Sequence, residues 1–217
     1  TLVRTPWLGE NAAQFLTSFY ELDGTPNDLD PRHVLGSVVD ALAHDGLTPV
    51  VAVELEFYLV DISRGRPVPA KGPVTGHRSE DIQVYGLREM EDFKPFFDDL
   101  YTACDAQNLP LESAISEYAP GQFELTLRHK ADALRATDDA VMYKRVVKGV
   151  AVKHGFEATF MAKPFAEHAG SGMHLHISMA DASGANAFAS QDPAGTPLLR
   201  HAIGGMKALL AESMLIF

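Results

Sequence analysis

The sequence predicts an α+β fold, in which helices cover one face of a β-sheet and the other face is open to a ligand. Two observations support this class. Segments with helical periodicity alternate along the chain with segments of strand periodicity. Several of the strand segments are apolar on one face only, whereas the strands of a doubly wound sheet are buried on both faces. The one-sided strands therefore favour α+β over doubly wound α/β.

A glycine-rich loop that runs into a strand occupies residues 170–178. Gly170 and Gly172 suit a tight backbone path with accessible N–H groups. In the alternating pattern that follows, His174 and His176 lie on the same face, about 7 Å apart. Two imidazoles on the polar face of an apolar strand need a partner, which can be a metal ion, a phosphate or water.

The stretch 51–59 alternates in the same way and carries two carboxylates. Glu54 and Glu56 share one face, and apolar residues occupy the other. Two such carboxylates repel each other unless water solvates them or a cation bridges them. A solvated strand face would need no function. This strand, however, is among the most apolar in the chain, which predicts a central place in the sheet where unpaired charge is costly.

A third stretch, 117–128, contains a turn at Pro120-Gly121 followed by a strand. Glu117 and Glu124 converge only if this turn folds them onto one side. If the three strands are neighbours in one sheet, their polar side chains form one site of four carboxylates and at least one histidine. Carboxylate-rich sites favour Mg²⁺ or Mn²⁺ over structural zinc, which prefers a closed site of Cys and His.

Helices are predicted where apolar residues recur at helical spacing. Asp30 followed by Pro31 is a strong helix start, because an N-cap precedes proline at the first helical position, and Gly46 ends that helix. The apolar stripe of this helix consists of Val34, Leu35, Val38, Val39 and Leu42. Further helices are expected over 91–108, with proline in the first turn, over 131–154, and from Pro197 onward.

The remaining segments are read as short strands and loops. Residues 13–22 fit a strand or a helix, and the turn-like Asp23-Gly24 that follows favours a strand. Short strands are expected over 109–115 and 156–162. The segment 61–90 is expected to be a long surface excursion, and 181–196 a loop.

Composition bounds the class of protein. The chain has 217 residues, 46% of them apolar and 22% charged, as in an ordinary soluble globular protein of one large domain or two small ones. No stretch of about 18 apolar residues predicts a transmembrane helix. With no secretory signal and one cysteine, a reducing cytoplasm is the expected location. The net charge of −11 argues against nucleic acid or an anionic membrane as partner.

The two ends of the sequence suggest a piece of a longer chain. The first residue is not Met, and the last helical segment ends apolar without a C-cap signal. We therefore expect the chain to be cut inside a domain.

The motifs together resemble the glutamine synthetase family. The stretches Val53–Phe57, Glu117–Glu124 and Gly170–Ser178 are similar, in this order, to the three signature stretches of its catalytic domain. The resemblance covers nearly the whole chain and implies a largely antiparallel curved sheet, with helices on one face and the metal and nucleotide site on the other. It also implies two regions. Residues 1–22 would be the tail of an N-terminal region or linker, and 23–217 the N-terminal part of an incomplete catalytic domain.

The resemblance further implies two or more divalent cations, Mg²⁺ or Mn²⁺, with ATP as co-substrate. Glu56, Glu117 and Glu124 match the ligands of the cation that touches the amino-acid substrate. Glu54 and His174 match ligands of the cation that touches the nucleotide phosphates.

Other residues match substrate contacts of the family. His176 matches a contact to the transferred phosphate and is the expected catalytic residue. Ser178 and Glu112 match nucleotide contacts. Gly170 matches a backbone contact to the substrate glutamate.

The implied activity is that of an ATP-dependent carboxylate–amine ligase. ATP phosphorylates the γ-carboxylate of glutamate, and an amine then displaces phosphate to form a γ-glutamyl amide. Ala169 stands where ammonia-using glutamine synthetases usually carry Asn, and Lys163-Pro164-Phe165 looks more like the γ-glutamyl-polyamine synthetase branch. An amine or polyamine is therefore the expected acceptor, with ammonia as the alternative. The ring-shaped assemblies of the family imply a homo-oligomer for the intact protein, and the fragment alone is expected to be inactive.

Two rival classes remain. A non-catalytic relative could keep the fold as a structural or binding protein, but such a descendant need not keep the five matched ligands. An unrelated metal hydrolase would need a water-activating base and no nucleotide.

Overall fold

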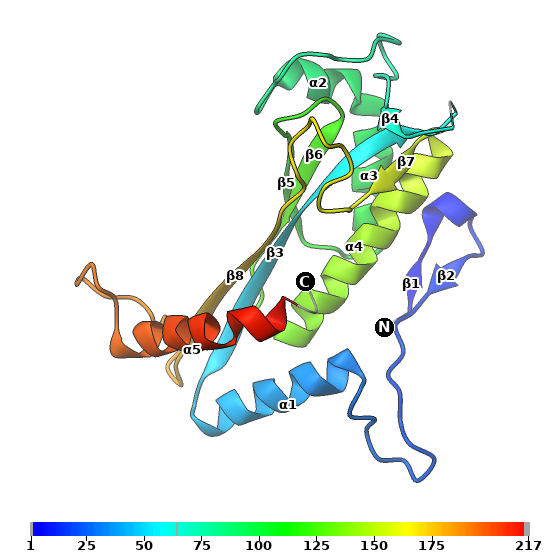
Figure 1. Ribbon diagram of the computed structural model, residues 1–217. Helices are drawn as coiled ribbons and strands as arrows, with labels where there is room; N and C mark the ends of the chain where they lie inside the picture. The colour runs from blue at the N-terminus through cyan, green and yellow to red at the C-terminus, as the bar shows by residue number, and fades with distance from the viewer. Residues whose placement is uncertain (1, 64, 215–217) are drawn as a thin grey trace.

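An antiparallel six-stranded sheet forms the framework of the protein (Figure 1). The computed structural model describes residues 2–63 and 65–214. The hydrogen-bonded order is β4-β3-β6-β5, and β7 and β8 also pair with β3. The strands are β3 (Thr48–Asp61), β4 (Val68–Pro69), β5 (Leu111–Ser116), β6 (Gln122–Leu127), β7 (Glu157–Thr159) and β8 (Met173–Ala180).

Strand β3 is the centre of this sheet. Its residues 54–58 pair with β6, and residues 48–55 pair with β8. Two further strands, β4 and β7, pair with its C-terminal end. The central place that was predicted for the apolar 51–59 stretch is therefore confirmed.

Helices α3 (Lys94–Ala106) and α4 (Ala133–Lys153) pack on one face of the sheet, and α4 runs along it in Figure 1. Because side chains alternate along a strand, β3 directs its odd-numbered residues at these helices. Phe57 and Leu59 are fully buried there against the helical side chains. Each such burial contributes roughly 1.5–3 kcal/mol. The even-numbered residues, Glu54 and Glu56 among them, lie on the opposite face. The α+β class with one covered face is thus confirmed.

Helix α1 (Pro31–His44) begins and ends as predicted. The Asp30 carboxylate accepts the backbone N–H of Arg32 at 2.8 Å, and Gly46 adopts a positive φ of 73° after the last turn. Only part of the predicted apolar stripe packs against the rest of the protein, however. Leu35 and Val39 pack against a small cluster on β3 and α4. Val34 and Val38 are about half exposed, because within the described residues α1 touches its neighbours along one narrow side.

Other segments agree with the predictions only in part. The helix expected over 91–108 is α3, which begins at Lys94 with Pro95 in its first turn, as predicted. A separate short helix, α2 (Leu87–Asp92), precedes it and was not predicted. Of 13–22, only Ala13–Gln14 forms a strand (β2), paired with β1 (Val3–Arg4). Of 156–162, only β7 is extended into the sheet.

The remaining elements are a short helix, η1 (Pro6–Leu8), and the C-terminal helix α5 (Pro197–Ser213). Thr196 caps α5 by accepting the backbone N–H of Leu199 at 3.2 Å. No described helix has both the length and the apolar character that crossing a bilayer requires.

Candidate metal and substrate site

The strand registers bring the predicted acidic and histidine residues to one face of the sheet. Glu56 on β3 lies opposite Glu124 on β6, and Glu54 lies opposite His174 on β8. Residues directly opposite each other on antiparallel strands point to the same face. Side chains from three strands therefore meet above the middle of β3.

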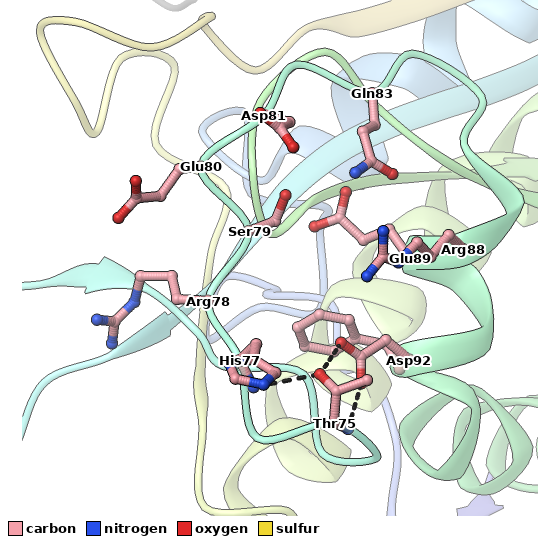
Figure 2. Close-up of a pocket in the computed structure, with 11 residues that line it drawn as sticks. Thr75, His77, Arg78, Ser79, Glu80, Asp81, Gln83, Arg88, Glu89 and Asp92 are labelled. Atoms are coloured by element: carbon pink, nitrogen blue, oxygen red, sulfur yellow. Dashed lines mark hydrogen bonds between the residues drawn. The ribbon is translucent and has the colours of Figure 1, made fainter.

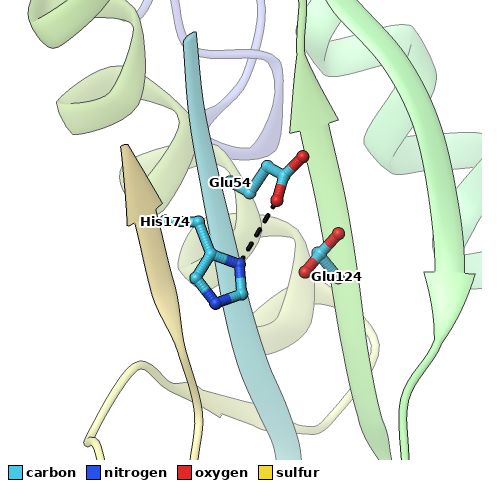
Figure 3. Close-up of side chains that lie close together, drawn as sticks. All are labelled: Glu54, Glu124 and His174. Atoms are coloured by element: carbon cyan, nitrogen blue, oxygen red, sulfur yellow. Dashed lines mark hydrogen bonds and ion pairs between the residues drawn. The ribbon is translucent and has the colours of Figure 1, made fainter. Parts of the chain in front are cut away.

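Two overlapping groups of candidate ligands result. One consists of Glu54, Glu124 and His174, which Figure 3 shows converging from the three strands. The other consists of Glu56, Glu117 and Glu124. In each group, ligand atoms from the three residues all lie within 4.8 Å of one another. Because Glu124 belongs to both groups, two cations bound here would share its carboxylate.

Electrostatics also favours cations at this site. Burial, followed by the charges of Glu54, Glu117 and Glu56, raises the pKa of Glu124 to about 7. Burial and the charge of Glu56 raise the pKa of Glu117. Buried like charges are costly unless an opposite charge compensates them. Several carboxylates and one imidazole fit Mg²⁺ or Mn²⁺ by both charge and donor type.

Glu54 is held by both histidines of β8. Its Oε1 lies 3.1 Å from His176 Nε2, and its Oε2 lies 3.3 Å from His174 Nδ1. Burial acts to raise the pKa of Glu54, but the hydrogen bonds from His176 and His174 outweigh it, so that the net pKa is lowered. This carboxylate is thus ionised more readily than Glu117 and Glu124, whose pKa values are raised.

The glycine loop before β8 is tied to the acidic face. The Gly170 carbonyl accepts a hydrogen bond from Gln122 Nε2 at 2.9 Å, and the Ala169 carbonyl accepts one from the Tyr58 hydroxyl at 2.7 Å. A side chain at Gly172 would place its Cβ 2.8 Å from Glu56 Oε1, so the Glu56 carboxylate would have to move to admit one. The loop therefore lies directly against the carboxylates.

Gln122 is the residue of this site to which the sequence pattern assigned no role. Its side-chain Nε2 donates to Glu56 Oε2 at 3.0 Å as well as to Gly170. The available signal was its position two residues before Glu124, on the same polar face of the strand.

Two predicted residues, Ser178 and Glu112, make no side-chain hydrogen bond to the acidic face or to the glycine loop within the described structure. Ser178 sits farther along β8, opposite Val50. Glu112 is exposed at the bulge in β5, where the pairing with β6 shifts register between Leu111 and Ser113. Their contacts to a nucleotide stay predictions.

A separate hollow of about 380 Å³ lies beside α2 and contains none of the predicted site residues (Figure 2). Glu89 in its wall is 5% exposed and accepts the backbone N–H of Gly121 at 2.8 Å. Burial raises the pKa of this carboxyl, while the Gly121 hydrogen bond acts to lower it. Glu89 thereby anchors the turn that precedes β6 to α2.

Residues 28–217 match the family model described as glutamine synthetase, catalytic domain. The chain therefore belongs to the glutamine synthetase family.

Two curated relatives act on glutamate and amines by name. The chain is 42% identical over 208 residues to gamma-glutamylputrescine synthetase PuuA of Escherichia coli (strain K12), covering 94% of this chain and 44% of that protein. It is 32% identical over 219 residues to glutamate–isopropylamine ligase of Pseudomonas sp, covering 100% of this chain and 47% of that protein. The chain thus spans less than half the length of these relatives.

The fold is also found among solved structures. The structure described as a GmaS/ADP complex superposes with a TM-score of 0.82 at 28% identity, covering 94% of this chain and 46% of that one.

Proposed function

We propose that the whole protein is an ATP-dependent carboxylate–amine ligase that forms a γ-glutamyl amide by way of γ-glutamyl phosphate. The observation that carries this proposal is the pair of overlapping ligand groups that share Glu124, in a chain of the glutamine synthetase family. The names of the amine-ligating relatives support the same reaction.

The proposed cation ligands follow the two groups. Glu56, Glu117 and Glu124 would hold the cation beside glutamate, and Glu54 and His174 would hold the one beside the ATP phosphates. When bound, Mg²⁺ or Mn²⁺ neutralises the phosphates and polarises the transferred group.

In the first step, a γ-carboxylate oxygen of glutamate attacks the γ-phosphorus of ATP and ADP leaves. In the second, the amine nitrogen attacks the acyl carbon, phosphate leaves, and the nitrogen loses a proton. Gly170 would contact glutamate through its backbone, and Ser178 and Glu112 would contact the nucleotide. His176 lies on the acidic face through its contact with Glu54, where its ring can donate a hydrogen bond to the transferred phosphate.

The acceptor is proposed to be an amine or polyamine, with ammonia as the alternative. The support is the similarity to gamma-glutamylputrescine synthetase and the presence of Ala169 beside the glycine loop. A small apolar residue there leaves no side-chain amide to hold ammonium.

A coupled ATPase assay of the whole protein tests these proposals, with glutamate plus putrescine, ethanolamine or ammonia. We expect ATP turnover to require glutamate and to be fastest with an organic amine. Ammonia as clearly the best acceptor would remove the amine preference. Turnover of a substrate without ATP would favour a hydrolase, and a lack of Mn²⁺ binding by the whole protein would favour a structural role.

The assembly, location and domain division are also proposals. We propose a cytoplasmic homo-oligomer, in which residues 1–22 form the end of an N-terminal region and 23–217 belong to the catalytic domain. The start of the family match at residue 28 supports this division, and native mass spectrometry of the whole protein tests the assembly.

A further inference from the structure

We propose that Gln122 is a positioning residue that joins the cation site to the glycine loop, an inference that rests on the proposed function. Gln122 follows the turn at Gly121 and is the first residue of β6, opposite Tyr58 on β3. Its side chain is fully buried between the two structures that it would connect.

The side-chain amide of Gln122 has a partner at each polar atom. Its Oε1 accepts the backbone N–H of Ala119 at 3.2 Å, while Nε2 donates to Glu56 Oε2 at 3.0 Å and to the Gly170 carbonyl at 2.9 Å. A backbone N–H can only donate, and an ionised carboxylate and a carbonyl can only accept. These partners leave one orientation of the amide.

This orientation has a consequence for the carboxylate. Glu56 belongs to the ligand group with Glu117 and Glu124. A hydrogen bond at Oε2 fixes the rotation of the Glu56 carboxylate and leaves Oε1 free for a cation. Partners that orient a metal ligand in this way affect metal affinity by about 10- to 100-fold in other proteins.

The second bond has a consequence for the loop. The Nε2 atom that holds Glu56 also holds the carbonyl of Gly170, the proposed contact to glutamate. A shift of the cation ligand is therefore transmitted to the glutamate side of the site. No described hydrogen bond links Gln122 to the predicted nucleotide residues Ser178 and Glu112, so the ATP side should respond less.

The test is Gln122→Met in the whole protein, which keeps the length of the side chain but removes its hydrogen bonds. We expect Mn²⁺ affinity, followed by electron paramagnetic resonance, to fall about tenfold or more, because a hydrogen bond to a charged group is lost. The KM for glutamate should rise by a similar factor, while the KM for ATP changes less than about threefold.

Tyr58→Phe is the matched control, since it removes a hydrogen bond from β3 to the same loop but no hydrogen bond of Glu56. It should raise the KM for glutamate and leave Mn²⁺ affinity unchanged. An equal loss of Mn²⁺ affinity in Tyr58→Phe, or wild-type Mn²⁺ affinity in folded Gln122→Met, overturns the proposal.

If Gln122→Met does not fold, Gln122→Asn serves the same comparison. It retains the amide but is one methylene too short to reach both partners. The Mn²⁺ titration requires no turnover. A wild-type protein that binds Mn²⁺ but forms no γ-glutamyl amide would therefore overturn the proposed function, while the titration still decides the role of Gln122 at the cation site.

Discussion

At the scale of single residues, Glu124 is the carboxylate of the acidic face that is both buried and surrounded by other glutamates. It is 8% exposed and is the carboxylate common to both ligand groups. Its raised pKa, about 7, arises first from burial and then from three neighbouring glutamates. An ionised carboxylate in such a place is destabilising unless an opposite charge compensates it, and a bound cation would supply that charge.

Replacement of a single ligand should remove activity without unfolding the protein. For Glu56→Ala or Glu117→Ala in the whole protein, we expect kcat/KM for amide formation to fall at least about 100-fold, because each change removes a proposed cation ligand. Circular dichroism should remain native, because the change also relieves repulsion between carboxylates. Glu157→Ala, on the exposed end of β7, is the control that keeps full activity. Wild-type turnover in either variant would remove that residue from the site.

His174→Ala should separate the two ligand groups. His174 lies in the group with Glu54 and Glu124 but not in the group with Glu56 and Glu117. Its removal should weaken binding of metal–ATP by about tenfold or more and change glutamate affinity much less. Isothermal titration with each ligand measures both constants. Equal losses for the two ligands would show that the groups do not act separately.

At the scale of elements, β3 and the turn before β6 determine where the ligands lie. Because β3 pairs with β6 on one edge and with β8 on the other, Glu54 and Glu56 lie between the side chains of these two strands. The turn before β6 brings Glu117 close to Glu124. That turn rests on α2 through the bond from the Gly121 N–H to Glu89. Because Gly121 has a positive φ of 71° and close backbone neighbours, a larger residue there would strain the turn.

Glu89→Gln should stabilise the whole protein at neutral pH. Burial raises the pKa of Glu89 in the folded state, so its contribution to stability is complete below the unfolded pKa and is lost as pH rises through the folded pKa. The glutamine carbonyl can still accept the Gly121 N–H but carries no charge to bury. Thermal unfolding should show a higher Tm for the variant at about pH 7 and little difference at about pH 4. A lower Tm at neutral pH would contradict this.

At the scale of the whole molecule, part of the excess negative charge is concentrated on one face of the sheet. The chain has a net charge of −11, and four of its carboxylates gather on one face of the sheet. The burial of two of them, Glu117 and Glu124, raises their pKa values. The free energy of unfolding of the metal-free protein therefore falls as these groups ionise. Bound divalent cations would reverse this trend.

Stability of the whole protein should therefore depend on pH in opposite ways with and without metal. For Glu117 and Glu124 the folded pKa exceeds the unfolded one. Their stabilisation is therefore complete below the unfolded pKa, at about pH 4, and is lost as pH rises through each folded pKa, which for Glu124 is about 7. In EDTA, Tm should fall over this window. With Mn²⁺ at 100 times its Kd, ionised ligands bind and add about 2.7 kcal/mol at neutral pH. Differential scanning calorimetry measures both curves, and an EDTA curve that is flat in pH would contradict the reasoning.

Local chemistry explains why much of the fold could be predicted. The alternation around Glu54 and Glu56 and the cap at Asp30 are encoded within a few residues, and the structure confirms them. The failures arose where neighbours decide. The exposure of Val34 and Val38 depends on what packs against α1. The place of Pro95 in the first turn of α3, by contrast, follows from local sequence and is confirmed.

The sequence by itself determined which residues share a strand face, the signature stretches that identify the family, and the carboxylate-rich chemistry of the site. Only the tertiary structure decided that Glu124 serves both ligand groups and that Gln122 bridges Glu56 to Gly170. The physical reason is strand register. The alternating pattern of a strand determines which face each side chain is on. Which residue lies opposite it across an antiparallel ladder is decided by pairing between segments far apart in the chain.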